Sequence, residues 1–291
     1  MLARRRRRLA STALLTPALV IVALLFVIPL GRIGFQSVQL PSVGLDNYRD
    51  LFTDGYTFTV LCRTLLSCAI VALVSGLLGY PYAYAMTVAS PRQRAVLMTI
   101  VLIPFWTSAL ARNYAWYVLF QDGGLFQRAA TWFGIDNFVL LGTTTAVTIA
   151  MTFTLLPFLI LPLYTNMDQI DRRLLLAART LGASRIEAFL RVYLPLSLPG
   201  LISGLSLVFV LGLGFYVAPA LLGSPQNAFV AQLIVIKLNS LGDFGGAGAL
   251  GIFILAVTIL ILTVGNRVAG LGVRALGASS MGTTNAREGK E

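Results

Sequence analysis

The sequence contains no histidine and only two cysteines, Cys62 and Cys68, among its 291 residues. Without histidine, the common zinc sites and the motifs that use an imidazole base are excluded. The cysteines are too few for a disulfide framework or a metal-ligand set, and we interpret them as small buried apolar side chains. The sequence therefore predicts neither a catalytic residue nor a metal site.

Charged residues are also scarce, at 11% of the chain against 57% hydrophobic residues, and the mean hydropathy is +0.83. Soluble domains carry about 25% charged residues, so this composition predicts an all-α polytopic membrane protein. A helix needs about 20 apolar residues to cross a membrane, and the charge-free windows give six spans within residues 12–267.

Two of these windows need interpretation. The first, Leu9 to Gly31, is compatible with a cleaved signal peptide, but no small-residue cleavage site stands out and we favour an uncleaved span. The window from Val192 to Ile236 is too long for one span, and the turn residues 223–227 divide it. We expect the following residues, 228–241, to form a helix or re-entrant piece at the outer surface.

The distribution of basic residues predicts the orientation of the spans. With the N-terminus inside, the inner segments hold sixteen bases and five acids, whereas the outer segments hold six of each. The whole net charge of +11 then lies inside, so we interpret it as a topology signal and not as a nucleic-acid surface. Residues 1–11 are predicted to be a basic cytoplasmic N-terminus and residues 268–291 a cytoplasmic tail.

The interiors of the predicted spans contain no Asp, Glu or Lys. Ion-coupled transporters and pumps usually need such a group within the membrane, so ion coupling is disfavoured. Neither Lys237 nor Lys290 is followed by the Ser or Thr that a phosphate-binding loop requires. If the protein is an active transporter, its ATPase is therefore another chain.

The segment between the fourth and fifth spans, residues 168–195, is charged and helix-forming. Asp171 is a plausible N-cap for a helix from Arg172 to Leu181, which Gly182 would end in a left-handed conformation. Ser184 and Glu187 have the spacing of a capping box for a second short helix that extends to Tyr193, before Pro195.

The pattern within the first of these helices places Leu174, Leu175, Ala178 and Leu181 on one apolar face. Two interpretations of the loop stay open. It either lies as a basic amphipathic segment on anionic lipid or docks into a groove on a partner protein.

The sequence LAARTLG at 176–182, followed twelve residues later by Leu194-Pro195, resembles the EAA loop of permease subunits of binding-protein-dependent ABC importers. The glutamate of that pattern is replaced by Leu176. The resemblance implies the type I ABC importer permease fold, with a core at about residues 61–267 and a loop that couples to the ATPase. The residues that would serve that coupling are Leu176, Ala177, Ala178, Gly182, Ser184, Glu187 and Pro195.

A second stretch is similar to the P-x-W-x-S and R-x-Y-A-W pattern of spermidine/putrescine-type permeases, at residues 104–108 and 112–116. Asn47-Tyr48 and Gly123-Gly124 match further features of that group. This similarity implies a polyamine or a related small amine or organic solute. Candidate residues of the solute pathway are Trp106, Arg112, Tyr114, Trp116, Phe215 and Tyr216.

Each candidate also has a simpler interpretation. The aromatic residues are typical of an interfacial belt as well as of a cation–π surface for an amine. Arg112 either extends to the membrane interface or lines the pathway, where it would repel a polycation. The glycines of the fifth span, which include Gly200 and Gly204, favour close packing either within this chain or against a second subunit.

The resemblance implies a set of partners in the inner membrane of a bacterium. They are an ABC ATPase dimer, a second permease subunit (favouring a heterodimer over a homodimer), an extracytoplasmic solute-binding protein and the lipid bilayer. It implies no cofactor on this chain, with ATP and Mg²⁺ bound by the ATPase. The competing hypotheses are an ATP-independent facilitator and a membrane scaffold that recruits a partner through the loop.

Overall fold

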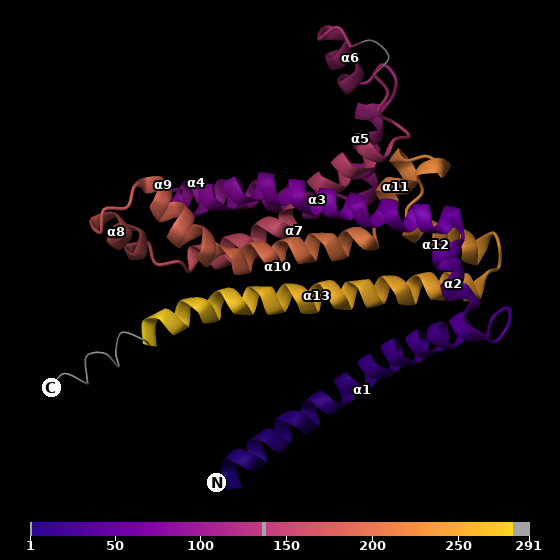
Figure 1. The fold of residues 1–291 in the computed structure, drawn as a ribbon, viewed down its shortest axis with the longest axis horizontal. Coiled ribbons are helices and arrows are strands. Elements are labelled where there is room, and N and C mark those ends of the chain that lie inside the picture. The colour runs from indigo at the N-terminus through magenta and orange to yellow at the C-terminus, as the bar shows by residue number, and fades with distance from the viewer. Residues whose placement is uncertain (1, 136–137, 282–291) are drawn as a thin grey trace. The chain divides into compact units, whose positions relative to one another are not determined.

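The computed structural model describes residues 2–135 and 138–281, and these residues form helices and connecting turns without any strand. At the predicted cytoplasmic ends, residues 1 and 282–291 lie outside the described residues, as do the side chains of Arg4 to Arg8 and Arg274. The elements (Figure 1) are α1 (Leu2–Gln39), α2 (Asp46–Thr53), α3 (Gly55–Val88), α4 (Pro91–Trp106), α5 (Ala109–Phe120), α6 (Leu125–Trp132), α7 (Thr144–Asp168), α8 (Arg173–Thr180), α9 (Arg185–Ala188), the π-helical turn η1 (Phe189–Tyr193), α10 (Leu194–Leu213), α11 (Val217–Leu222), the 3₁₀ turn η2 (Pro225–Asn227), α12 (Val230–Asn239) and α13 (Phe244–Met281).

Five helical segments are long and apolar enough to cross a membrane, and a bent pair raises the count to six. The pair joins Pro91–Trp106 to Ala109–Trp132 at an angle of 98°. The predicted six spans agree with this higher count, in which the third span is broken near Thr107. The inward orientation of both termini stays a prediction.

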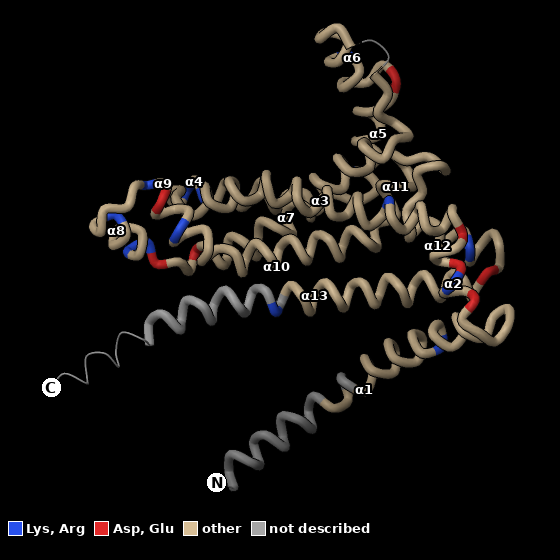
Figure 2. Tube along the Cα trace, in the orientation of Figure 1, with Lys and Arg blue, Asp and Glu red and all other residues tan. Residues whose placement is uncertain are grey.

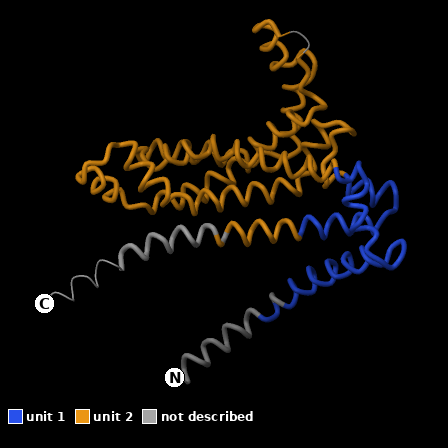
Figure 3. The backbone as a smooth tube through the Cα atoms, in the orientation of Figure 1, with its two compact units in different colours: residues 1–58, 233–255 blue, residues 59–232, 256–291 orange. Residues whose placement is uncertain are grey.

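The chain divides into two compact units, which Figure 3 distinguishes by colour. Unit 1 contains residues 1–58 and 233–255, and unit 2 contains residues 59–232 and 256–291. We describe each unit by itself.

In unit 1 the end of α1 is fastened to α2 by the pair Asn47-Tyr48. The Asn47 amide donates to the Ser37 carbonyl at 2.9 Å, and the Ser37 and Tyr48 hydroxyls lie 2.8 Å apart. Since Ser37 is fully buried and Asn47 nearly so, these bonds satisfy polar groups that burial would otherwise leave unpaired. The Asn-Tyr pair therefore has a structural role in the described chain.

Unit 1 also contains a half-buried ion pair between Lys237 and Asp243, at 2.7 Å. Burial raises the pKa of Asp243, but the hydrogen bond from the Lys237 ammonium and the one from the Gly246 N–H outweigh it. The pKa of this carboxyl is therefore lowered from its ordinary value. The pair joins α12 to the start of α13.

In unit 2, α7 packs against α10, α4, α5 and α11. Figure 1 shows α3, α7 and α10 running alongside one another, with α8 and α9 at one end and α5 and α11 at the other. Charged residues of this unit gather around α8, α9 and the start of α4, while the long helices between the two ends are almost free of charge (Figure 2). This pattern is the one expected of spans that end in water.

The predicted helix or re-entrant piece at 228–241 is a helix, α12. Its start is buried, since Phe229 has no exposed surface and Val230 has 1%. The Thr64 hydroxyl accepts a hydrogen bond from the Val230 N–H at 3.0 Å, so α3 caps this helix.

Glycines bring α10 into close contact with α7. A Cβ atom at Gly200 would lie 2.5 Å from the Asn166 Cβ, and one at Gly204 would lie 3.0 Å from the Leu159 carbonyl oxygen. The Leu159 side chain also faces α3, where a Cβ at Gly79 would lie 2.5 Å from its Cδ2 atom. These glycines therefore serve packing within the chain, the first of the two predicted alternatives.

We expect Gly204→Val to destabilise the protein. The atom that the new side chain would meet is the backbone carbonyl oxygen of Leu159, which cannot rotate away as a side chain could. Overpacking of this kind costs about 1–3 kcal/mol, which should lower the thermal unfolding temperature in detergent, measured by scanning fluorimetry. Gly214→Val is the matched control, since a Cβ there would have nothing within 4 Å. Equal unfolding temperatures for the two variants would contradict this account of the packing.

Candidate functional site

Local hydrogen bonds shape the loop at 168–195. The predicted N-cap Asp171 was one residue too early, since α8 begins at Arg173 and Arg172 is its N-cap; the Asp171 carboxylate accepts from the Arg173 N–H at 2.9 Å in the turn before the helix. At its end Gly182 has a φ of +94°, and the Ala183 N–H donates to the Ala178 carbonyl at 3.1 Å. Glycine is the residue that adopts this left-handed conformation most readily.

The capping box is also present. The Ser184 hydroxyl accepts from the Glu187 N–H at 3.2 Å, and the Glu187 carboxylate accepts from the Ser184 N–H at 3.0 Å. These reciprocal bonds start α9 directly after the turn at Gly182. The corner between α8 and α9 is therefore determined by hydrogen bonds that lie within the loop itself.

The prediction of a separate second helix ending before Pro195 was wrong. Instead, α9 continues through η1 into α10, and the resulting helical segment spans Arg185–Leu213. In η1 the Leu194 N–H donates to the Phe189 carbonyl, which is the wider π-type bond. Proline lacks an N–H, but Pro195 lies in the first turn after this widening, where the helix tolerates the missing donor.

The predicted single apolar face of α8 is divided in the structure. Leu175 and Ala178 are half-buried, whereas Leu174 and Leu181 are exposed. α8 packs mainly on its neighbours α9 and η1, and much of its apolar surface is exposed in the described chain. We call the exposed residues the loop apolar patch: Leu174, Leu176, Leu181 and Ile186.

Arginines hold this loop against the end of α3. Arg172 donates to the Thr87 carbonyl, and Arg94 donates to the Met86 carbonyl at 3.2 Å. Arg94 also forms an ion pair with Asp168 at 3.6 Å. The last carbonyls of a helix lack intrahelical partners and carry partial negative charge, so cations are favourable there. The apolar patch is therefore presented on a loop that is tied to the spans.

Arg112 lies on α5, near the end of α10 that is remote from the loop at 168–195. It stabilises the bend between α4 and α5. One terminal nitrogen of its guanidinium, Nη2, donates to the carbonyls of Pro104 at 2.7 Å and Thr107 at 3.2 Å. The Pro104 carbonyl also accepts from the Thr107 N–H, at a long 3.4 Å, because the chain turns at Thr107 and Ser108. The spacing between the P-x-W-x-S and R-x-Y-A-W patterns thus places an arginine where it can donate hydrogen bonds to the backbone carbonyls at the break between α4 and α5.

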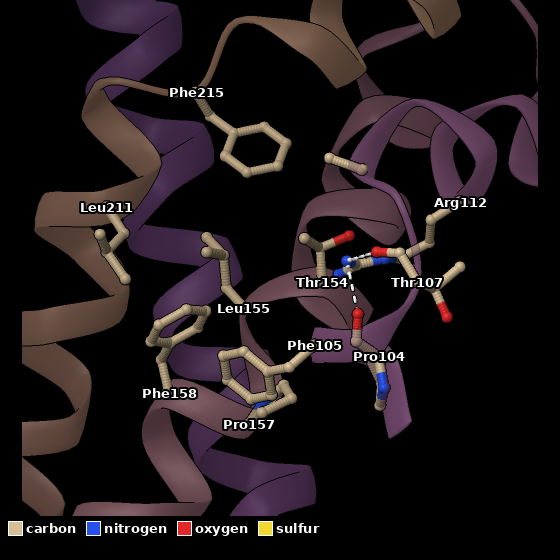
Figure 4. A pocket seen from close by; sticks show the side chains of 11 residues that line it. Pro104, Phe105, Thr107, Arg112, Thr154, Leu155, Pro157, Phe158, Leu211 and Phe215 are labelled. Atoms are coloured by element: carbon tan, nitrogen blue, oxygen red, sulfur yellow. Dashed lines mark hydrogen bonds between the residues drawn. The ribbon is translucent and has the colours of Figure 1, made fainter. Parts of the chain in front are cut away.

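A pocket of about 400 Å³ lies beside this bend, bounded by α4, α5, α7 and the end of α10. Figure 4 shows the Arg112 guanidinium and Thr154 on one wall, with Phe215, Leu211 and Phe158 opposite them. Apart from Arg112, Thr107 and Thr154 the lining side chains are apolar, and no carboxylate is among them. The pocket has the size of a small-molecule site.

A family model described as the inner membrane component of binding-protein-dependent transport systems matches residues 2–276. The chain belongs to that family. It is therefore a multi-pass inner membrane transport component, a permease subunit and not an enzyme.

Curated relatives cover most of the permease. It is 33% identical over 222 residues to the spermidine/putrescine transport system permease protein PotB of Escherichia coli, covering 76% of this chain and 80% of that protein. It is 34% identical over 252 residues to PotB of Haemophilus influenzae, covering 85% and 86%. The sulfate transport system permease protein CysT of Salmonella typhimurium is 26% identical over 255 residues, with 86% and 89% covered.

Solved structures show the same fold. A chain of a bacterial alginate ABC transporter, in complex with an alginate-bound periplasmic protein, matches the permease with a TM-score of 0.72 at 18% identity, over 90% of this chain and 94% of that one. A chain of the MetNI methionine ABC transporter matches with a TM-score of 0.55 at 18% identity, over 74% and 97%. The predicted ABC importer permease fold is thus confirmed.

Only two of the six candidate pathway residues, Arg112 and Phe215, line the pocket of the permease. Trp106 is 90% exposed, and Trp116 stacks on Phe120 and contacts Phe153 in a tilted arrangement. Tyr114 stacks on Tyr117, and Tyr216 is exposed outside the pocket. These aromatic residues do not converge on one point of the described chain, as an aromatic cage for an amine would require.

Sequence reasoning missed Thr154 and Phe158 on α7 and Phe105 on α4, all of which line the pocket. Nothing in the local pattern of Thr154 and Phe158 distinguishes them from ordinary span residues, and Phe105 occupies an unspecified position of the P-x-W-x-S pattern. A threonine and a phenylalanine four residues apart on a helix share a face, but the sequence does not say what that face meets.

Proposed function

We propose that this permease forms half of the solute pathway of an ATP-driven importer and that the loop at 168–195 couples it to a separate ATPase dimer. The observation that carries the proposal is the loop apolar patch. Exposed apolar groups on an ordered loop are characteristic of a docking surface, and this loop is tied to α3 by Arg94 and Arg172. The arginines around the patch indicate that the loop lies on the cytoplasmic side of the membrane.

The remaining parts of the proposal follow from the family. A second permease subunit completes the pathway, as a heterodimer in preference to a homodimer, and an extracytoplasmic binding protein delivers the solute. Closure of the ATPase dimer on ATP draws the docked loops together, and the spans change from inward-open to outward-open. Coupling is then the shift of a two-state equilibrium by a ligand that binds one state better. ATP and Mg²⁺ belong to the ATPase.

The solute is proposed to be a small organic molecule of the polyamine type or a related amine. Relatives that are about one-third identical are named for spermidine and putrescine. A relative that is 26% identical is named for sulfate, so family membership alone does not determine the charge of the solute.

Reconstitution tests the proposal. Vesicles that contain this chain alone should show no solute flux above protein-free vesicles, because half of a pathway cannot alternate. Vesicles with the chain, its partner permease and its ATPase should hydrolyse ATP faster when the solute-loaded binding protein is added. Flux through the chain alone would favour the ATP-independent facilitator, and ATP hydrolysis that is indifferent to the chain would favour the scaffold.

A further inference from the structure

The pocket beside the α4–α5 bend contains a cation without a counterion. Arg112 lines it, and among the described residues this guanidinium has no ion pair with any carboxylate. Its partners are two backbone carbonyls, which bind Nη2, while the Nε atom is buried without a hydrogen-bond partner. A charged donor left unpaired in an apolar surrounding is costly, so the site favours an anionic acceptor.

Thr154 supplies a second unpaired donor on the same wall (Figure 4). Its hydroxyl is buried and unbonded, although the other threonines in the body of α7 are satisfied. Thr148, Thr152 and Thr165 each donate to the carbonyl four residues earlier, at 2.8 Å in all three cases. Since buried polar groups are nearly always hydrogen-bonded, the Thr154 hydroxyl is available to a partner that enters the pocket.

We propose that this pocket binds a carboxylate group of the transported solute, with Arg112 as the ion-pair partner and Thr154 as a second donor. The apolar wall of Phe105, Phe158 and Phe215 would hold the carbon chain of the solute. This inference rests on the proposed function and narrows it, because the amine-bearing solute then also carries an acidic group. An amine group beside Arg112 is repelled where water is excluded, so an amine of the solute would lie away from the guanidinium.

The pocket lies at the end of α10 that is remote from the coupling loop. The segment Arg185–Leu213 has the loop at its start, and Phe215 follows its last residue. With the loop in the cytoplasm, the pocket lies toward the outer side, where the binding protein delivers the solute. The carboxylate is therefore bound at an early stage of passage.

A matched four-carbon series tests this chemistry: putrescine with two amines, 4-aminobutyrate with one amine and one carboxylate, and succinate with two carboxylates. Equilibrium binding of each radiolabelled compound is measured on the purified transporter complex without the binding protein, so that the selectivity of the binding protein does not enter. We expect a carboxylate probe to bind at least about tenfold more tightly than putrescine, since a charge-assisted hydrogen bond replaces a repulsion.

Two variants assign the binding to the pocket. Arg112→Lys keeps the charge but removes the Nε donor, and Thr154→Val removes the hydroxyl at nearly constant shape. Each should weaken carboxylate binding by about tenfold. Thr152→Val is the matched control, because its hydroxyl already donates to the Thr148 carbonyl, and it should bind as the unmodified protein does.

The inference would be overturned by tighter binding of putrescine than of both carboxylates, by carboxylate binding that neither variant weakens, or by no binding of any probe. Saturation of the site by phosphatidylglycerol with no affinity for the small carboxylates would also overturn it, in favour of a lipid phosphate. Co-purification with the ATPase is measured on the same samples. If the ATPase is retained while carboxylate binding fails, only the inference about the pocket is lost, and the proposed coupling stands.

Discussion

Replacing Gly182 by proline is expected to cause a large loss of solute uptake while the protein still inserts into the membrane. Proline fixes φ near −65°, whereas Gly182 has a φ of +94° and donates its N–H to the Arg179 carbonyl at 3.0 Å. The substitution therefore removes a donor and imposes a backbone that the turn cannot adopt, at a cost of about 1–3 kcal/mol or more. Because the turn joins α8 to α9, a change in its backbone changes the angle between these two helices. Uptake and co-purification with the ATPase should both fall by about tenfold or more.

The chain offers a closely matched control for this variant. Gly134 follows α6 with a φ of +76° and donates its N–H to the Thr131 carbonyl at 3.0 Å, and a Cβ would meet nothing within 4 Å at either glycine. Gly134→Pro thus imposes the same local strain away from the coupling loop. It should retain co-purification with the ATPase. Equal losses of ATPase binding in the two variants would show that the effect is general and not one of coupling.

The second large effect is expected from the double substitution Leu181→Asp and Ile186→Asp. These side chains are 88% and 72% exposed, so charging them should cost the isolated permease little. If both are buried on the ATPase, each contributes about 1.5–3 kcal/mol to docking, and the double variant should bind the ATPase at least about a hundredfold more weakly. The measurement is the dissociation constant of the purified ATPase for permease in nanodiscs.

Val43→Asp with Leu45→Asp controls for the mere loss of exposed apolar surface. These residues are 82% and 68% exposed and lie between α1 and α2, outside the coupling loop. The control should bind the ATPase normally. A control that weakened binding as much as the loop variant, or a loop variant that bound normally, would refute docking at the loop apolar patch.

Features that depend on neighbouring residues were well predicted from the sequence. The capping box of Ser184 and Glu187 and the left-handed glycine at 182 are both present as expected, because each arises from bonds within a few residues. Long apolar windows likewise identified the spans, since the hydrocarbon core imposes a minimum length.

Two kinds of feature were not predicted: those that depend on distant contacts, and those that depend on whether a helix can accommodate a proline. Pro195 suggested the end of a helix, but the π-type turn at η1 allowed the helix to continue, and local pattern does not reveal such widening. The pocket could not be predicted either, because it needs residues from α4, α5, α7 and the end of α10. The motif residue Arg112 was identified, but its bonds to Pro104 and Thr107 follow from a 98° bend that composition does not specify.

The position of Leu159 limits how this permease can change shape. Its side chain faces Gly79 on α3 and its backbone faces Gly204 on α10, both without room for a methyl group. Packed surfaces with so little clearance do not slide past one another easily, so the three helices should travel as a rigid body. We then expect this group of helices to rotate about junctions that have free space around them. Gly214 is such a junction, since nothing lies within 4 Å of a Cβ added there. That junction adjoins Phe215, so a hinge there would change the width of the pocket.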